Sequence, residues 1–95
     1  MNQDPFPPRT IDVLLPDLES GDDPVRFVTW LVAEGARVIP GERIAELLTQ
    51  GIVWQLEATA SGILTQLSAQ PGRVVSSGEL LARITVQDDS TSDTD

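Results

Sequence analysis

The amino-acid sequence predicts an all-β domain made of two similar sheets, and three observations support this fold class. Short runs of apolar and β-branched residues alternate with turn residues, so that glycine and proline interrupt the chain every eight to twelve positions, as in small sandwiches and barrels. No segment shows the sustained periodicity of an amphipathic helix. The chain also contains an internal repeat, which predicts two equivalent halves.

The runs predict six longer strands. In chain order, these strands cover residues 11–15, 25–32, 43–48, 52–57, 62–69 and 79–86. The first run ends at Pro16, which cannot donate a ladder hydrogen bond. The third and fourth runs flank Thr49, Gln50 and Gly51, where the glycine favours the positive φ of a tight hairpin turn.

The internal repeat adds two short strands to this set. Residues 35–47 align without gaps on residues 72–84, and five of the thirteen aligned positions are identical. The identities include both glycines of a Gly-x₅-Gly unit and the glutamate that follows the second glycine. Each unit predicts a turn, a short strand and a second turn. The two halves are therefore expected to be related by a pseudo-two-fold axis.

The ends of the chain are not expected to join this fold. Residues 1–10 contain three prolines and are predicted to be a flexible leader, whereas residues 87–95 are acidic and polar and are predicted to be a disordered tail. Residues 11–86 form the predicted domain. No apolar run is long enough for a membrane helix and no signal peptide is visible, so we expect a cytoplasmic protein, monomeric as an isolated chain.

Composition limits the chemistry that the chain can perform. The chain has 15 carboxylates and six arginines, a net charge of −9, which argues against binding to nucleic acid or to an anionic membrane. The acidity either keeps the protein soluble or selects a basic partner. Histidine, cysteine, lysine and tyrosine are all absent, so the usual general bases, covalent nucleophiles and thiolate metal ligands are missing. We predict neither an enzyme nor a metal site.

Two motifs resemble those of lipoyl domains. The run WLVAEG at residues 30–35, followed by Val38 and Gly41, is similar to the family pattern W-l-v-x-e-G-d-x-V-x-x-G. Residues 16–18 resemble the pattern P-d-l-G, with Glu19 in place of the glycine. The resemblance covers residues 11–86. It implies a barrel-sandwich hybrid of two four-stranded antiparallel sheets, of the lipoyl type found in 2-oxoacid dehydrogenase acyltransferases.

The resemblance also locates a missing residue. Members of the family attach lipoate, or biotin in the biotinyl branch, to a lysine at a hairpin tip, within the pattern E-T-D-K-A. Counting eleven residues back from Gly62, the usual separation, leads to Gly51, and counting forward from residues 44–46 leads to the same place. The pattern here reads LTQGI, residues 48–52. Because the chain contains no lysine, we expect it to carry no cofactor.

The hairpin tip is the candidate binding site, and it allows two interpretations. Gly51 either relaxes the turn once no lysine is needed there, or leaves a bare surface on which a protein partner docks. The candidate partner-binding residues are Leu48, Thr49, Gln50, Gly51 and Trp54.

Three aromatic residues are predicted to be structural. Trp54 shares a strand face with Ile52 and Leu56, so it is expected to fill the core near the base of the hairpin. A position on the rim beside Leu48 would instead make Trp54 an anchor for a partner. Phe27 and Trp30 are both expected in or against the core.

The preferred hypothesis is a non-catalytic lipoyl-like binding or scaffold module. Its partner would be a dehydrogenase or acyltransferase subunit, or a lipoylation enzyme that the domain occupies without being modified. One alternative is a former acyl-group carrier that has lost its lysine; only Thr49 of the flanking E-T-D and A remains, which argues for long divergence. The other is an adaptor domain of an unrelated assembly, usually inserted between long helices that this chain lacks.

Overall fold

The computed structural model describes residues 9–86 and has eight strands and no helix in that range, so no helix there could span a membrane. The predicted all-β class is confirmed. The strands are β1 (Thr10–Leu14), β2 (Val25–Trp30), β3 (Arg37–Val38), β4 (Arg43–Thr49), β5 (Ile52–Glu57), β6 (Gly62–Thr65), β7 (Val74–Val75) and β8 (Leu80–Val86). The predicted leader before Arg9 and the predicted tail lie outside the described residues.

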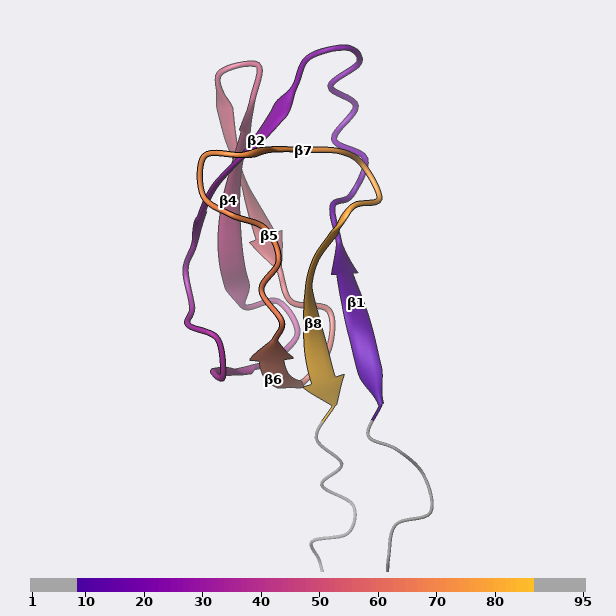
Figure 1. Cartoon of the computed structure of the whole chain (residues 1–95), viewed down its shortest axis with the longest axis vertical. Coiled ribbons are helices and arrows are strands. Elements are labelled where there is room, and N and C mark those ends of the chain that lie inside the picture. Colours follow the sequence, from indigo (N-terminus) through magenta and orange to yellow (C-terminus); the bar gives the residue numbers. More distant parts are fainter. Residues whose placement is uncertain (1–8, 87–95) are drawn as a thin grey trace, which may run out of the picture.

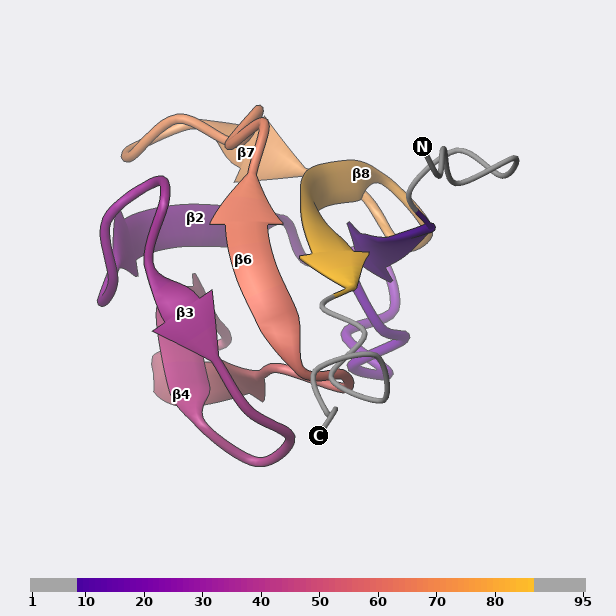
Figure 2. The same cartoon turned by 90° about the horizontal axis from the view of Figure 1, so that it is seen from below.

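The strands form two four-stranded antiparallel sheets, with orders β1-β8-β6-β3 and β5-β4-β2-β7. If four is added to each strand number of the first sheet, counting on from β8 to β1, the result is the strand order of the second sheet. The strand order therefore has the predicted pseudo-two-fold symmetry. Figure 1 shows the β4–β5 hairpin at one end of the domain and the outer ends of β1 and β8 at the other, and Figure 2 shows the two layers from below.

The sequence repeat coincides with this symmetry. β3 and β7 lie 37 positions apart, as do β4 and β8, and the second residue of each short strand is buried. The repeated glutamate has the same role twice: Glu42 accepts a hydrogen bond from the Ile39 amide at 3.2 Å, and Glu79 accepts one from the Ser76 amide at 2.8 Å. These contacts satisfy amides in the turns that begin β4 and β8. The two predicted turn–strand–turn units are confirmed.

Several strand boundaries differ from the prediction. β1 begins at Thr10, within the predicted leader, and the Val86 amide donates to the Arg9 carbonyl at 2.8 Å. β2 ends at Trp30 rather than at residue 32, because the chain bends over the next two residues. β6 ends at Thr65, because Gln66 has a positive φ of 53°, which a strand cannot continue.

The core lies between the two sheets. Its buried apolar residues come from every strand and from the connecting segments: Val13, Leu15, Val25, Phe27, Val38, Ile44, Ala45, Leu47, Leu56, Ala58, Leu64, Ala69, Val75, Leu81, Ala82 and Ile84. Phe27 is fully buried, as predicted, and its ring lies 4.8 Å from that of Trp30, measured between centroids. Trp30 is half-buried and its Nε1 donates to the Ala69 carbonyl at 3.0 Å, so its predicted structural role is confirmed.

Candidate functional site

The tip of the β4–β5 hairpin is a two-residue turn. Thr49 and Ile52 face each other across the ladder, and Gln50 and Gly51 connect them with φ angles of 55° and 74°. Two successive positive φ values are characteristic of a type I′ turn, whose twist matches that of the flanking strands. The predicted hairpin is therefore present, and Gly51 occupies a position that favours glycine. A Cβ atom built on Gly51 would meet no other group within 4 Å.

Two side chains hold this tip against the loop that precedes β2. Gln50 Nε2 donates to Asp23 Oδ2 at 2.8 Å and lies 3.4 Å from the Ser20 carbonyl. Thr49 is buried, and its Oγ1 donates to the Pro24 carbonyl at 2.9 Å. The glutamine lies in a backbone region that disfavours side chains with a Cβ, so these contacts offset a local cost. The tip is therefore positioned by tertiary contacts as well as by its own turn.

A pocket of about 210 Å³, open to solvent, lies beside the tip. It brings together four of the five predicted partner-binding residues with three from the neighbouring loop and β2, and its lining is Asp23, Pro24, Arg26, Leu48, Thr49, Gln50 and Gly51. Trp54 does not line it. Arg26 is positioned by a hydrogen bond from Nη1 to the Gly72 carbonyl at 2.6 Å.

The expectation that Trp54 fills the core is wrong. The face of the sheet on which Trp54 lies was predicted correctly. Residues directly opposite each other in a ladder share a face, and Trp54 lies opposite Leu47, which is buried. However, β5 is one of the two edge strands of its sheet. The exposed fraction along that face is 51% at Ile52 and 41% at Trp54, and it falls to 8% only at Leu56, near the base of the hairpin. The neighbouring strand covers one side of Trp54 and leaves the other open to solvent.

The backbone conformation of Glu19 bears on the resemblance to the pattern P-d-l-G. It stands where that pattern has glycine, and its φ is 56°, in the left-handed region that favours glycine. Its backbone amide donates to Oδ1 of Asp17 at 2.8 Å, which closes a local turn. Glu19 thus adopts a conformation that glycine would adopt without a steric cost.

Sequence reasoning missed part of this site. Asp23, Pro24 and Arg26 contribute to the pocket, and Ile52 and Val53 add exposed apolar surface to the hairpin. The loop residues carry no motif that would place them beside a turn some 27 positions away. The exposure of β5 depends on strand order, which no local pattern specifies. Within residues 9–86, no group of three or more acidic side chains is arranged to hold a metal ion.

Comparison with known proteins places these features in a family context. The family model described as "Biotin-requiring enzyme" matches residues 12–84. The succinyltransferase component of the Escherichia coli 2-oxoglutarate dehydrogenase complex is 31% identical over 75 residues, which cover 79% of this chain and 18% of that protein. The acetyltransferase component of the pyruvate dehydrogenase complex of Rickettsia typhi is 33% identical over 86 residues, covering 90% of this chain and 21% of that protein.

Solved structures agree with the sequence comparisons. The lipoyl domain of the 2-oxoglutarate dehydrogenase complex from Azotobacter vinelandii superposes with a TM-score of 0.66 at 29% sequence identity, covering 79% of this chain and 95% of that domain. The chain spans about a fifth of the length of the two acyltransferase components it matches. The likeness therefore concerns one domain of those proteins.

Proposed function

Since the chain belongs to the biotin/lipoyl attachment family and has the lipoyl-type fold of 2-oxoacid dehydrogenase acyltransferase domains, we propose that it is a non-catalytic protein-binding module that carries neither lipoate nor biotin. In carriers, the hairpin end bears the cofactor. In this proposal, the hairpin end of the domain itself binds a protein partner. The proposed module acts in the cytoplasm.

The observation that carries this proposal is the absence of lysine. Attachment of lipoate or biotin in this family forms an amide with a lysine ε-amine, and the chain has none at Gly51 or elsewhere. Gly51 and Gln50 also adopt positive φ angles, so a lysine at this tip would add a local conformational cost of about 1 kcal/mol. Glycine at position 51 avoids this cost, which supports the proposal.

The proposed partner is a subunit of a 2-oxoacid dehydrogenase complex. The support is that the acyltransferase relatives are named as components of such complexes. The candidate contact surface is the pocket beside the tip with the exposed Trp54, because open apolar and aromatic surface is a common feature of protein interfaces.

Intact-mass measurement after co-expression with a lipoate or biotin ligase tests the first half of the proposal. The unaltered chain, Gly51→Lys and the double variant Gln50→Asp/Gly51→Lys are expected to gain no cofactor mass. The Azotobacter vinelandii lipoyl domain serves as the positive control. A mass gain in the unaltered chain would overturn the proposal, and a gain in the lysine variants alone would favour a carrier that has simply lost its lysine.

Equilibrium binding to purified dehydrogenase-complex subunits tests the second half. Saturable binding to one subunit is expected, and Gly51→Arg should weaken it about tenfold because it fills the surface beside the tip. Gly41→Arg is the matched control: its glycine also has a positive φ and open space around it, but it lies in the turn before β4, at the other end of that strand. Equal binding by both variants would exclude the tip, and no binding to any subunit would exclude this class of partner.

A further inference from the structure

Within residues 9–86, β5 has an unpaired sheet edge. It pairs only with β4, and no backbone hydrogen bond among the described residues joins it to another strand. In a two-residue hairpin the pair that closes the turn is hydrogen-bonded, so the alternation of the ladder directs the N–H and C=O groups of Val53 and Gln55 away from β4. These groups are available to a further strand.

The same edge is unusually apolar. Ile52, Val53 and Trp54, here called the apolar edge, are 51%, 56% and 41% exposed. Proteins normally protect a sheet edge with charged residues, prolines, bulges or very short strands. Within residues 52–56 of β5, the sequence has neither a charged residue nor a proline. The strand is six residues long, which corresponds to about 20 Å of available edge.

The other three edge strands of the described domain are protected. β3 and β7 have two residues each, too few to template a further strand. β1 has a charged residue in its middle, Asp12, which is paired with Arg83 of the adjacent strand at 3.0 Å. The open edge of β5 is thus the exception within this fold.

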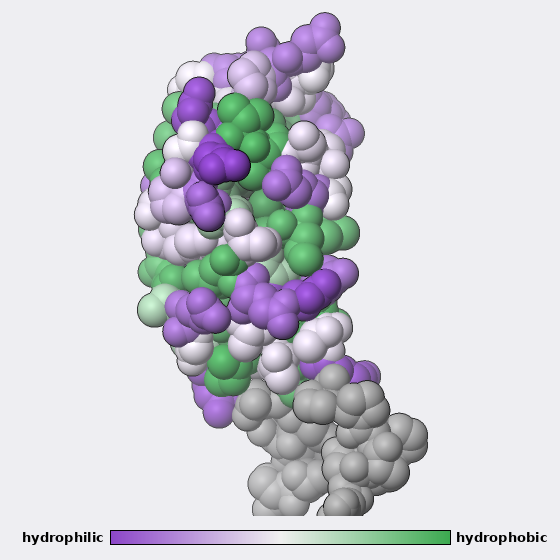
Figure 3. Space-filling view, in the orientation of Figure 1, coloured by the Kyte–Doolittle hydropathy of each residue, from purple (hydrophilic) through white to green (hydrophobic). Residues whose placement is uncertain are grey.

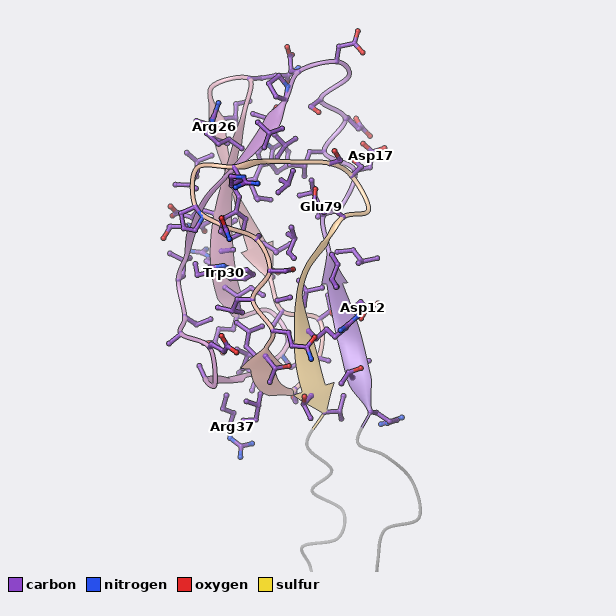
Figure 4. All side chains as sticks on the ribbon, viewed as in Figure 1. Asp12, Asp17, Arg26, Trp30, Arg37 and Glu79 are labelled. Carbon is purple, nitrogen blue, oxygen red and sulfur yellow. The ribbon has the colours of Figure 1, made fainter. Side chains whose placement is uncertain are left out.

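Charge is distributed unevenly between the part of the described chain that contains this edge and the rest. Loop 15–24 and the strands β2, β4 and β5 with their turns (residues 15–30 and 42–57) contain seven carboxylates and two arginines, whereas the other described residues contain three carboxylates and four arginines. In Figure 4, Asp17 and Arg26 lie toward the hairpin end and Arg37 lies at the opposite end. Figure 3 shows hydrophobic surface beside strongly hydrophilic surface at the hairpin end. The excess of carboxylates repels an acidic strand and attracts a basic one.

We propose that β5 binds an extended basic segment of a partner protein as an additional antiparallel or parallel strand, with alternate apolar side chains of that segment packed against the apolar edge. This inference rests on the proposed function and specifies its partner: a segment that alternates apolar residues with lysine or arginine. Main-chain hydrogen bonds would provide affinity, and the alternating side chains and charges would provide specificity. A second copy of this chain is a poorer occupant, because its own edge lies in an equally acidic region.

The test uses the full chain and synthetic peptides of about ten residues, long enough to cover β5. One peptide alternates valine with lysine, a second replaces every lysine with glutamate, and a third places proline at alternate positions of the basic sequence. The basic peptide is expected to bind, with binding weakened about tenfold or more between roughly 0.05 and 0.5 M salt. Amide exchange at Val53 and Gln55 should slow in the complex. Equal binding of the acidic or proline peptide would overturn the proposal.

Two matched variants locate the binding strand. Val53→Glu places a charge on the apolar edge and should weaken peptide binding about tenfold. Val74→Glu makes the same change at a residue of nearly equal exposure, 55%, on the opposite edge of the same sheet, and should change binding less than about twofold. Gln55→Pro provides a second measurement, because it removes one outward N–H without adding charge. Equal effects of Val53→Glu and Val74→Glu would overturn the proposal, and thermal melts establish that each variant is folded.

The remaining outcomes separate this inference from the proposed function. A concentration-dependent dimer that Val53→Glu dissociates would overturn it, because a second copy would then be the occupant. Binding to a dehydrogenase-complex subunit that is unaffected by Val53→Glu and Gln55→Pro would also overturn it, while leaving the proposed binding function intact. Binding of the basic peptide with no binding to any complex subunit would support the strand-addition site and contradict the proposed class of partner.

Discussion

Gln50 at the hairpin tip donates a hydrogen bond from Nε2 to Oδ2 of Asp23, 2.8 Å away and 27 positions earlier in the chain. The contact joins the tip of the candidate site to the acidic loop before β2. It forms although Gln50 has a positive φ of 55°, a conformation that favours glycine or asparagine. The orientation of the tip thus depends on a residue outside the hairpin.

A double-mutant cycle measures this contact. Gln50→Ala and Asp23→Ala should each destabilise the domain, with a coupling free energy of about 0.5–1 kcal/mol, because both side chains are exposed and their interaction is partly screened by water. The coupling free energy is obtained from urea unfolding of the unaltered chain, the two single variants and the double variant. Additivity within about 0.3 kcal/mol would show that the contact contributes nothing to stability.

Glu19 provides a test of backbone strain. Replacing it with glycine should make the domain about 1 kcal/mol more stable than replacing it with alanine, because φ is 56° at this position and both changes remove the same carboxylate. The backbone hydrogen bond to Asp17 can form in both variants. Thermal unfolding should show a difference of about 4–8 °C between the two. Equal midpoints would mean that the glutamate is not strained.

Trp30 and Trp54 should differ in their contributions to stability. Trp30→Phe removes the indole N–H that donates to the carbonyl of Ala69, a buried residue, and should cost about 1–2 kcal/mol. Trp54→Phe should cost less than about 0.5 kcal/mol, because Trp54 is 41% exposed. Chemical denaturation followed by circular dichroism compares the two variants. A larger loss for Trp54→Phe would contradict the assigned roles.

Gly62 should tolerate no side chain. A Cβ atom at this position would lie 2.1 Å from the carbonyl oxygen of Thr85 in the neighbouring strand, so β6 and β8 would have to separate. Gly62→Ala should therefore destabilise the domain by about 3 kcal/mol or prevent folding. Gly51→Ala is the control, because open space surrounds that position and only its positive φ opposes the change, at about 1 kcal/mol. Equal stabilities of the two variants would contradict the close approach of the strands.

The internal repeat explains why so much of the fold was predictable. Gly35 and Gly72 lie at equivalent positions in the turns before β3 and β7, and Glu42 and Glu79 satisfy equivalent amides in the turns before β4 and β8. Such turn chemistry is local, so it is visible in the sequence before any strand pairing is known. The repeat then implied two matching sheets, and the observed strand orders have that symmetry.

The candidate site was less predictable. The hairpin and the position of Gly51 followed from the sequence, but the burial of Trp54 did not. Alternation along a strand predicts which side chains share a face, and Trp54 does share its face with Leu56. It does not predict whether another layer covers that face, because coverage depends on residues that are distant in the chain.

By itself, the sequence determined the all-β class, the two repeated units, the hairpin and the absence of a lysine, because each depends on residue identity or on turns spanning a few residues. Only the tertiary structure decided that β5 is an open edge and that Asp23 holds Gln50. The physical reason is that strand order and side-chain partners are set by packing among segments far apart in the chain, and local propensity does not encode which segments become neighbours.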